Sequence, residues 1–196
     1  MTEFRFELSP FNYKKVHGRK GVVGDFGEVT LEVERRKGFS RESGIHSEVR
    51  LRGENLPDTV YRTVGPGQPT LKNARLLING HRCEMRFNSK GFRNASRALK
   101  LTYRERSYEY SVTRFEKGAT LSRPGSLVTL THGKSSAAKG MSTFGTATGE
   151  VDSIDLALAI VFEGVDTLEL TATGAVSETL NRLLNSPRRN EPIGDY

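Results

Sequence analysis

Cysteine and tryptophan are almost missing from this chain of 196 residues, which has one cysteine and no tryptophan. A single cysteine cannot form an internal disulfide bond. The first residues, Met1 to Arg5, also lack the basic start and apolar core of a secretory signal. Both absences favour a reducing environment, and we expect a cytoplasmic location.

Long hydrophobic runs are missing too. No apolar segment approaches the roughly 18 residues that a membrane-spanning helix needs. Thr2 occupies the position where myristoylation requires glycine, and the C-terminal residues include no cysteine for prenylation. We therefore expect no transmembrane segment, and any contact with a membrane should be peripheral.

Patterns of metal ligands and nucleophiles are equally scarce. The four histidines are far apart, and none is paired with another histidine or a cysteine at metal-ligand spacing. Cys83 alternates with Met85 and Phe87, which is typical of a small buried residue in a strand. We expect no metal, no cofactor and no enzymatic activity, although residues distant in sequence can meet in space. The histidines are His17, His46, His81 and His132.

What the chain does have is period-two alternation of apolar and polar residues, together with 20 glycines and 7 prolines. This pattern predicts many short, half-buried strands joined by turns. Asn79-Gly80 separates two such segments, and this pair supplies the positive φ angles of a type I′ hairpin turn. The predicted strands include residues 4–8, 29–33, 49–51, 74–78, 82–87, 99–103, 108–112 and 127–131.

The segment from Asp152 to Gly164 differs from everything before it because residues 156–162 are apolar on every face. Asp152 is a plausible N-cap, Asp155 lies where the helix dipole favours an anion, and Gly164 is placed to end a helix. We predict a buried helix over 152–163, with a buried strand as the alternative, since its apolar residues also alternate.

The remaining segments have weaker signals. Residues 65–69 and the Gly/Ser/Thr-rich stretch 133–149 are predicted to be irregular, and 65–69 could mark a domain boundary. After the helix, 167–173 is predicted as a strand and 177–184 as a short amphipathic helix. The favoured interpretation is one mainly β domain over 1–185, an antiparallel barrel or sandwich of about ten to twelve strands, followed by a disordered tail over 186–196.

The excess of basic residues is concentrated between residues 71 and 106, which carry a net charge of +8 against +7 for the whole chain. Such a stretch attracts phosphate groups, nucleic acid or anionic lipid over about 8 to 10 Å. The alternative is a set of solvated strand faces. Arg104 and Arg106 are expected in one strand, on the same face. The candidate anion-binding residues are Arg86, Lys90, Arg93, Arg97, Lys100, Arg104 and Arg106.

A long series of hairpins followed by one wholly apolar helix resembles the tubby-like superfamily, which includes the LURP-one-related proteins. The segment Asp-Ser-Ile-Asp-Leu-Ala-Leu-Ala-Ile-Val-Phe, residues 152–162, is similar to the central helix of that family. The resemblance implies a closed barrel around a hydrophobic helix and a non-enzymatic fold with affinity for anionic lipid head groups. The family ends at or just after its helix, whereas this chain continues to residue 196.

These observations favour a non-catalytic binding or scaffold domain that engages a phosphorylated ligand or an anionic lipid surface through a basic face. Two alternatives use other partners. Nucleic acid could bind the same face, because aromatic residues that can stack on bases interleave with its basic residues. A structural role in a larger assembly would need a protein partner or a second copy of the chain.

Overall fold

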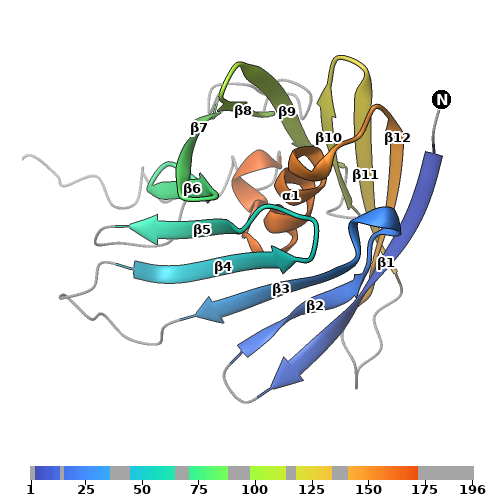
Figure 1. The fold of residues 1–196 in the computed structure, drawn as a ribbon. Coiled ribbons are helices and arrows are strands. Elements are labelled where there is room, and N and C mark those ends of the chain that lie inside the picture. Colours follow the sequence, from blue (N-terminus) through green and yellow to red (C-terminus); the bar gives the residue numbers. More distant parts are fainter. Residues whose placement is uncertain are drawn as a thin grey trace, which may run out of the picture.

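Twelve β-strands form a closed antiparallel barrel in the computed structural model, which describes residues 3–13, 16–35, 45–64, 71–87, 98–113, 118–133 and 141–171 (Figure 1). Each strand pairs with its neighbour in the sequence, and β1 closes the barrel by pairing with β12. The strands are β1 (Glu3–Tyr13), β2 (Val16–Val22), β3 (Glu28–Arg35), β4 (Ile45–Gly53), β5 (Thr59–Val64), β6 (Ala74–Ile78), β7 (His81–Phe87), β8 (Leu99–Tyr103), β9 (Arg106–Val112), β10 (Gly118–Arg123), β11 (Ser126–His132) and β12 (Thr143–Gly149).

The helix α1 (Ser153–Val161) fills the lumen of this barrel. It contacts β4 and β5 on one side and β10 and β11 on the other, and these two pairs of strands lie half a barrel apart. Every residue from Asp155 to Val161 is buried. The prediction of a buried helix is confirmed, and the alternative of a buried strand is wrong. The prediction of a mainly β fold with ten to twelve strands is also confirmed.

The capping signals explain why this segment is helical. The Asp152 carboxylate accepts hydrogen bonds from the backbone N–H groups of Ile154 and Asp155, and the Asp155 carboxylate accepts one from the Asp152 N–H. This reciprocal capping box satisfies donors that a buried helix terminus cannot leave unpaired. After Val161 the chain tightens into a 3-10 turn, η4 (Phe162–Gly164). A Cβ atom on Gly164 would lie 2.6 Å from Cγ1 of Val49, so the turn fits against β4 only with glycine.

Period-two alternation places one set of strand residues against α1 and the other set outside. On β8, Leu99, Leu101 and Tyr103 are buried, while Lys100 is exposed. The same alternation on the other strands supplies the rest of a single core. The Asn79-Gly80 hairpin is confirmed as well, with φ angles of 48° and 77° at the two turn residues.

Two predictions for the later part of the chain are wrong. Residues 143–149 were expected to be irregular, yet they form β12, the strand that closes the barrel. Its inward residues are small because Phe6 packs directly over Gly145, where a Cβ atom would lie 2.0 Å from the ring. The region 167–171 contains a 3-10 turn, η5 (Leu168–Leu170), in place of a strand. The predictions for 65–69, 177–184 and 186–196 concern residues outside the described ranges.

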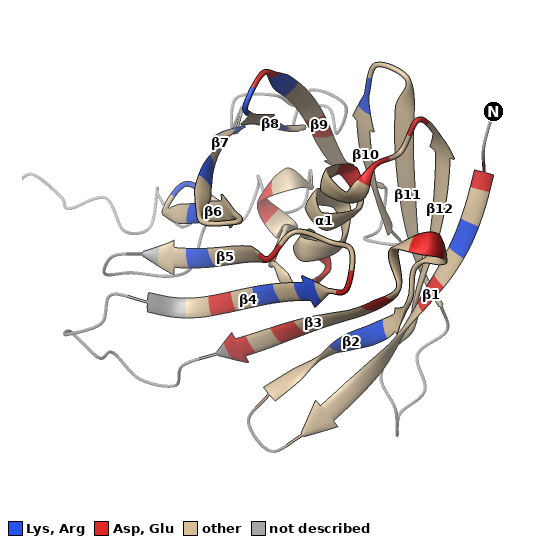
Figure 2. Ribbon diagram, in the orientation of Figure 1, with Lys and Arg blue, Asp and Glu red and all other residues tan. Residues whose placement is uncertain are grey.

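The charge of the outer surface differs between neighbouring strands of the barrel (Figure 2). The outward positions of β3 carry Glu28, Glu32 and Glu34, whereas those of β4 to β8 are mostly Lys and Arg. No helix in the described part of the chain is long and apolar enough to cross a membrane.

Candidate functional site

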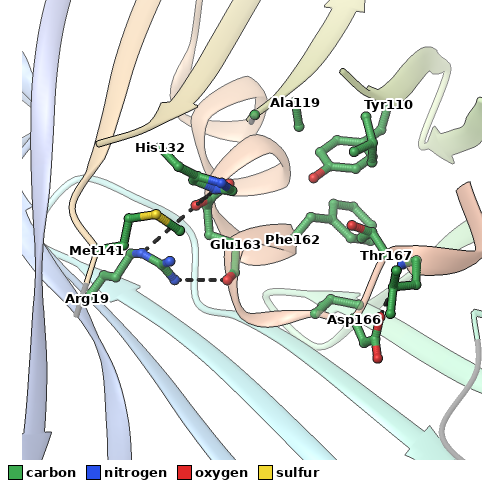
Figure 3. Close-up of a pocket in the computed structure, with 13 residues that line it drawn as sticks. Arg19, Tyr110, Ala119, His132, Met141, Phe162, Glu163, Asp166 and Thr167 are labelled. Carbon is green, nitrogen blue, oxygen red and sulfur yellow. Dashed lines mark hydrogen bonds and ion pairs between the residues drawn. The ribbon is translucent and has the colours of Figure 1, made fainter. Parts of the chain in front are cut away.

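A pocket of about 250 Å³ opens at the mouth of the barrel where α1 ends (Figure 3). Its lining comes from β2, β9, β10, β11, from Met141 just before β12 and from the turns after α1. The barrel is antiparallel, so odd-numbered strands end and even-numbered strands begin at this mouth. The lining residues of these strands therefore gather at one end of the barrel. The lining includes Arg19, Tyr110, His132, Met141, Phe162 and Glu163.

The polar wall of this mouth pocket is organised around Glu163, whose side chain is only 3% exposed. Its carboxylate accepts a hydrogen bond from the Thr143 hydroxyl at 2.6 Å and lies 3.0 Å from Nε2 of His132. Nη1 of Arg19 donates to the Glu163 carbonyl oxygen at 2.9 Å, and Nε of Arg19 lies 3.9 Å from the carboxylate. The four residues meet at the negative end of the α1 dipole, where the Arg19 charge is favourable.

Glu163 is ionised in this setting. Burial raises the pKa of the carboxyl group, but hydrogen bonds from His132 and Thr143 and the charges of His132 and Arg19 outweigh it and lower the pKa below 4.5. A negative charge next to the C-terminal end of a helix opposes the helix dipole. The polar network therefore has a structural role: it compensates a buried anion that would otherwise destabilise this end of the barrel.

A second cavity, of about 350 Å³, lies on the other side of Arg19 and Glu163. It shares Arg19, Met141 and Glu163 with the mouth pocket and adds residues of β1 and β3 such as Phe11 and Val33. The Arg19–Glu163 pair thus lines two adjoining cavities.

The opposite end of α1 carries another network of ion pairs. Arg123 donates to both oxygens of Asp155, to the Glu150 carbonyl oxygen and to the Pro124 carbonyl oxygen. Arg106 forms an ion pair with Asp152, the N-cap residue. The capping carboxylates are therefore satisfied by arginines.

The seven predicted anion-binding residues are only partly brought together. Arg86 and Lys100 are directly opposite each other on β7 and β8. The expectation that Arg104 and Arg106 share one strand face is wrong, because Arg104 lies in the two-residue turn between β8 and β9 with a φ of 53°. Arg106 is engaged by Asp152. The other three predicted residues, Lys90, Arg93 and Arg97, are outside the described residues.

A different grouping of basic residues emerges on the outer face of β4 to β8. We call it the β4–β8 face, and it holds seven cations and two anions among the described residues with outward positions. Figure 2 shows the basic residues distributed over these neighbouring strands. The cations are Arg50, Arg52, Arg62, Arg75, Arg82, Arg86 and Lys100, and the anions are Glu48 and Glu84.

Ion pairs neutralise only part of this face. Glu48 bridges Arg50 and Arg62, and Glu84 contacts Arg86 at 3.5 Å. The hydrogen bonds and charges of both arginines lower the pKa of Glu48 although burial raises it. The other four cations have no ion pair with another described residue: Arg52, Arg75, Arg82 and Lys100.

Three aromatic residues near this basic stretch do not lie on its surface. Tyr103, Tyr108 and Tyr110 are 2 to 3% exposed and belong to the core. Cys83 is buried too, and burial raises the pKa of its thiol to about 12. No group of three or more His, Cys, Asp or Glu residues in the described ranges is arranged to hold a metal ion.

Comparisons with protein families, with curated proteins and with solved structures find no match to this chain. Its function is therefore argued from the geometry.

Sequence reasoning missed the mouth pocket. Arg19 is more than a hundred positions from both His132 and Glu163 along the chain, and only closure of the barrel brings the three residues together. One signal was available, because Arg19 alternates along β2 with His17 and Gly21 and therefore shares their face of the strand. In the barrel this face points inward. Recognising that this face points inward requires the register of β2 against β3, which the sequence does not give.

Proposed function

We propose that this protein is a non-catalytic binding domain that docks its β4–β8 face onto an anionic membrane surface through lipid phosphate groups. The observation that carries the proposal is the group of four exposed cations without an ion pair in the described chain: Arg52, Arg75, Arg82 and Lys100.

The register of the strands places like charges next to one another. Arg62 is directly opposite Arg75, and Arg86 is directly opposite Lys100. Like charges at opposite positions of an antiparallel pair destabilise the sheet. A bound anion between two such cations removes this repulsion and forms charge-assisted hydrogen bonds with both.

The dimensions of the face suit an extended anionic surface. Neighbouring strands are about 4.8 Å apart, so the five strands β4 to β8 span roughly 20 Å. A face of this width can contact several lipid head groups at once. Because it is wider than the Debye length of about 8 Å at physiological ionic strength, cations on its two edges are largely screened from one another. Each basic side chain near such a surface contributes about 1 kcal/mol to binding.

Burial of the aromatic residues favours lipid over single-stranded nucleic acid. Binding to bases would use exposed aromatic side chains as stacking platforms, whereas Tyr103, Tyr108 and Tyr110 lie in the core. Arginines and a lysine remain on the surface, and these recognise phosphate groups without contacting a base. The resemblance to the tubby-like superfamily, which stays a prediction, points in the same direction.

The positions of the remaining reactive side chains support a non-catalytic role. The Cys83 thiol is buried with a raised pKa, so it is a poor nucleophile. Glu163, a carboxylate with a buried side chain at the mouth pocket, is held by Thr143, His132 and Arg19 and has a lowered pKa. A general base needs a pKa close to the working pH, and this carboxylate is far from it.

Vesicle flotation tests the proposal. The full chain should float with phosphatidylcholine vesicles that contain phosphatidylserine or a phosphoinositide. With vesicles of pure phosphatidylcholine it should remain in the bottom fraction. Raising the salt concentration should release it, because screening weakens every contact. Absence of flotation with any anionic vesicle at low salt would overturn the proposal, and so would tighter binding to a DNA duplex than to the vesicles.

A further inference from the structure

We infer that the mouth pocket binds a small, neutral molecule that combines an apolar body with a carbonyl or amide oxygen. The inference is independent of the β4–β8 face, since the pocket is lined by residues of β2, of β9 to β11 and of the turns after α1, and by Met141.

The apolar part of the pocket is preformed. Phe162 and Tyr110 pack with their ring centroids 4.6 Å apart and line the pocket from η4 and β9. Val112, Met141 and Leu168 add aliphatic surface nearer the rim. Figure 3 shows Tyr110, Phe162 and Met141 around the same space as the polar side chains. Most small-molecule sites have this combination of a largely apolar lining and a few fixed polar groups.

The size sets the scale of the ligand. The mouth pocket measures about 250 Å³, close to the lower limit of roughly 300 Å³ for drug-sized ligands. The adjoining cavity of about 350 Å³, which shares Arg19 and Glu163 with the mouth pocket, offers further room next to it. A two-ring molecule therefore fits the first cavity by itself.

Unused hydrogen-bond donors define the polar end of the ligand. A guanidinium group has five N–H donors, and one of those on Arg19 is donated to the Glu163 carbonyl oxygen. Nε of Arg19 is buried and has no hydrogen-bond partner. The Tyr110 hydroxyl makes no hydrogen bond with another described residue. The pocket thus keeps unused donors on Arg19 and Tyr110, and a ligand oxygen that accepts hydrogen bonds complements them.

Charge balance decides between a neutral ligand and an anion. The positive charge of Arg19 is already compensated by Glu163, which is ionised. Asp166, which also lines the pocket, adds a second carboxylate whose Oδ1 accepts from the Leu168 N–H. A ligand carboxylate or phosphate would face these two anions at close range, and like charges repel strongly where water is scarce. A neutral carbonyl or amide oxygen can accept the spare hydrogen bonds without this repulsion.

The fluorescent ketone prodan, a neutral naphthalene with one carbonyl oxygen, is a suitable probe. We expect saturable binding of one probe per chain, with a blue shift of its emission. The anionic naphthalene sulfonate ANS has a similar body and should bind at least about tenfold more weakly, a difference of roughly 1.4 kcal/mol. Tyr110→Phe removes only the hydroxyl group. It should lower the affinity for prodan about fivefold, as expected for the loss of one hydrogen bond.

Leu168→Arg places a charged side chain at the rim of the pocket and should lower the affinity for prodan at least about tenfold. Leu127→Arg is the matched control, because Leu127 has a similar exposure, 40% against 45%, but lies on the outer face of β11. Both changes are at exposed positions, so both chains should fold, which circular dichroism checks. Absence of saturable prodan binding, equal effects of the two arginine variants, or ANS binding as tight as prodan would overturn the inference.

Discussion

Arg123 and Asp155 form a bidentate ion pair that joins the barrel wall to the first turn of the central helix. Nε of Arg123 donates to Oδ1 of Asp155 at 2.7 Å, and Nη2 donates to Oδ2 at 2.9 Å. The same carboxylate accepts from the Ser126 hydroxyl and the Asp152 N–H. With its side chain 1% exposed, Asp155 is a buried anion whose charge is fully compensated by hydrogen bonds.

Replacing this carboxylate should be costly. Asp155→Asn keeps the shape of the side chain but removes the charge, and its amide N–H₂ faces the donors of Arg123. Breaking a buried pair in this way costs about 3 kcal/mol. Urea denaturation of both chains measures the loss. Glu3→Gln is the control, because the Arg5–Glu3 pair is exposed, and its loss should stay below about 1 kcal/mol. Equal losses would contradict a structural role for Asp155.

The network around Glu163 should make stability depend on pH. Its pKa in the folded protein is lower than its ordinary value of 4.5, so it contributes stability above pH 4.5 that is lost as the pH falls through the folded pKa. Melting temperatures between pH 7 and pH 3 should therefore decline less steeply for Glu163→Gln than for the wild type. The variant should also be less stable at pH 7, where Arg19 loses its partner. Glu105→Gln, at an exposed turn, should follow the wild-type curve, and identical slopes for all three chains would contradict this account.

The contact between Gly145 and Phe6 should control closure of the barrel. Gly145→Ala introduces a Cβ atom 2.0 Å from the tip of the Phe6 ring, at the β1–β12 seam. Overpacking of this kind costs about 1 to 3 kcal/mol. Phe6→Leu withdraws the ring tip, so the double variant should lose less stability than the two single changes together. Additive losses in urea denaturation would show that the two residues do not interact.

Local signals in the sequence predicted the helix and most strands. Asp152 and Asp155 identify the start of α1 because a capping box depends only on residues three positions apart. The Asn79-Gly80 turn is equally local. β12 escaped detection because its inward positions are Thr143, Gly145 and Ala147, whose small size reflects the space left by Phe6 and α1. No neighbouring residue in the sequence carries that information.

The candidate sites were harder to predict because they depend on which strands become neighbours. Arg75 and Arg82 join Arg62 on one face only once β5, β6 and β7 have paired in this register. Conversely, Arg104 leaves the predicted face because a turn, and not a strand, occupies its position. A count of basic residues along the chain therefore indicated an anionic partner but not the surface that would contact it.

The central claim is that the β4–β8 face, and not the overall positive charge, binds anionic membranes. Two double variants separate these possibilities, since each lowers the net charge from +7 to +3. Arg75→Glu with Arg82→Glu reverses two cations on the face, and Arg5→Glu with Lys20→Glu reverses two exposed cations on β1 and β2. Flotation with phosphatidylserine-containing vesicles should be abolished by the first pair and largely retained by the second. Equal loss in both double variants, or retention in both, would contradict the claim.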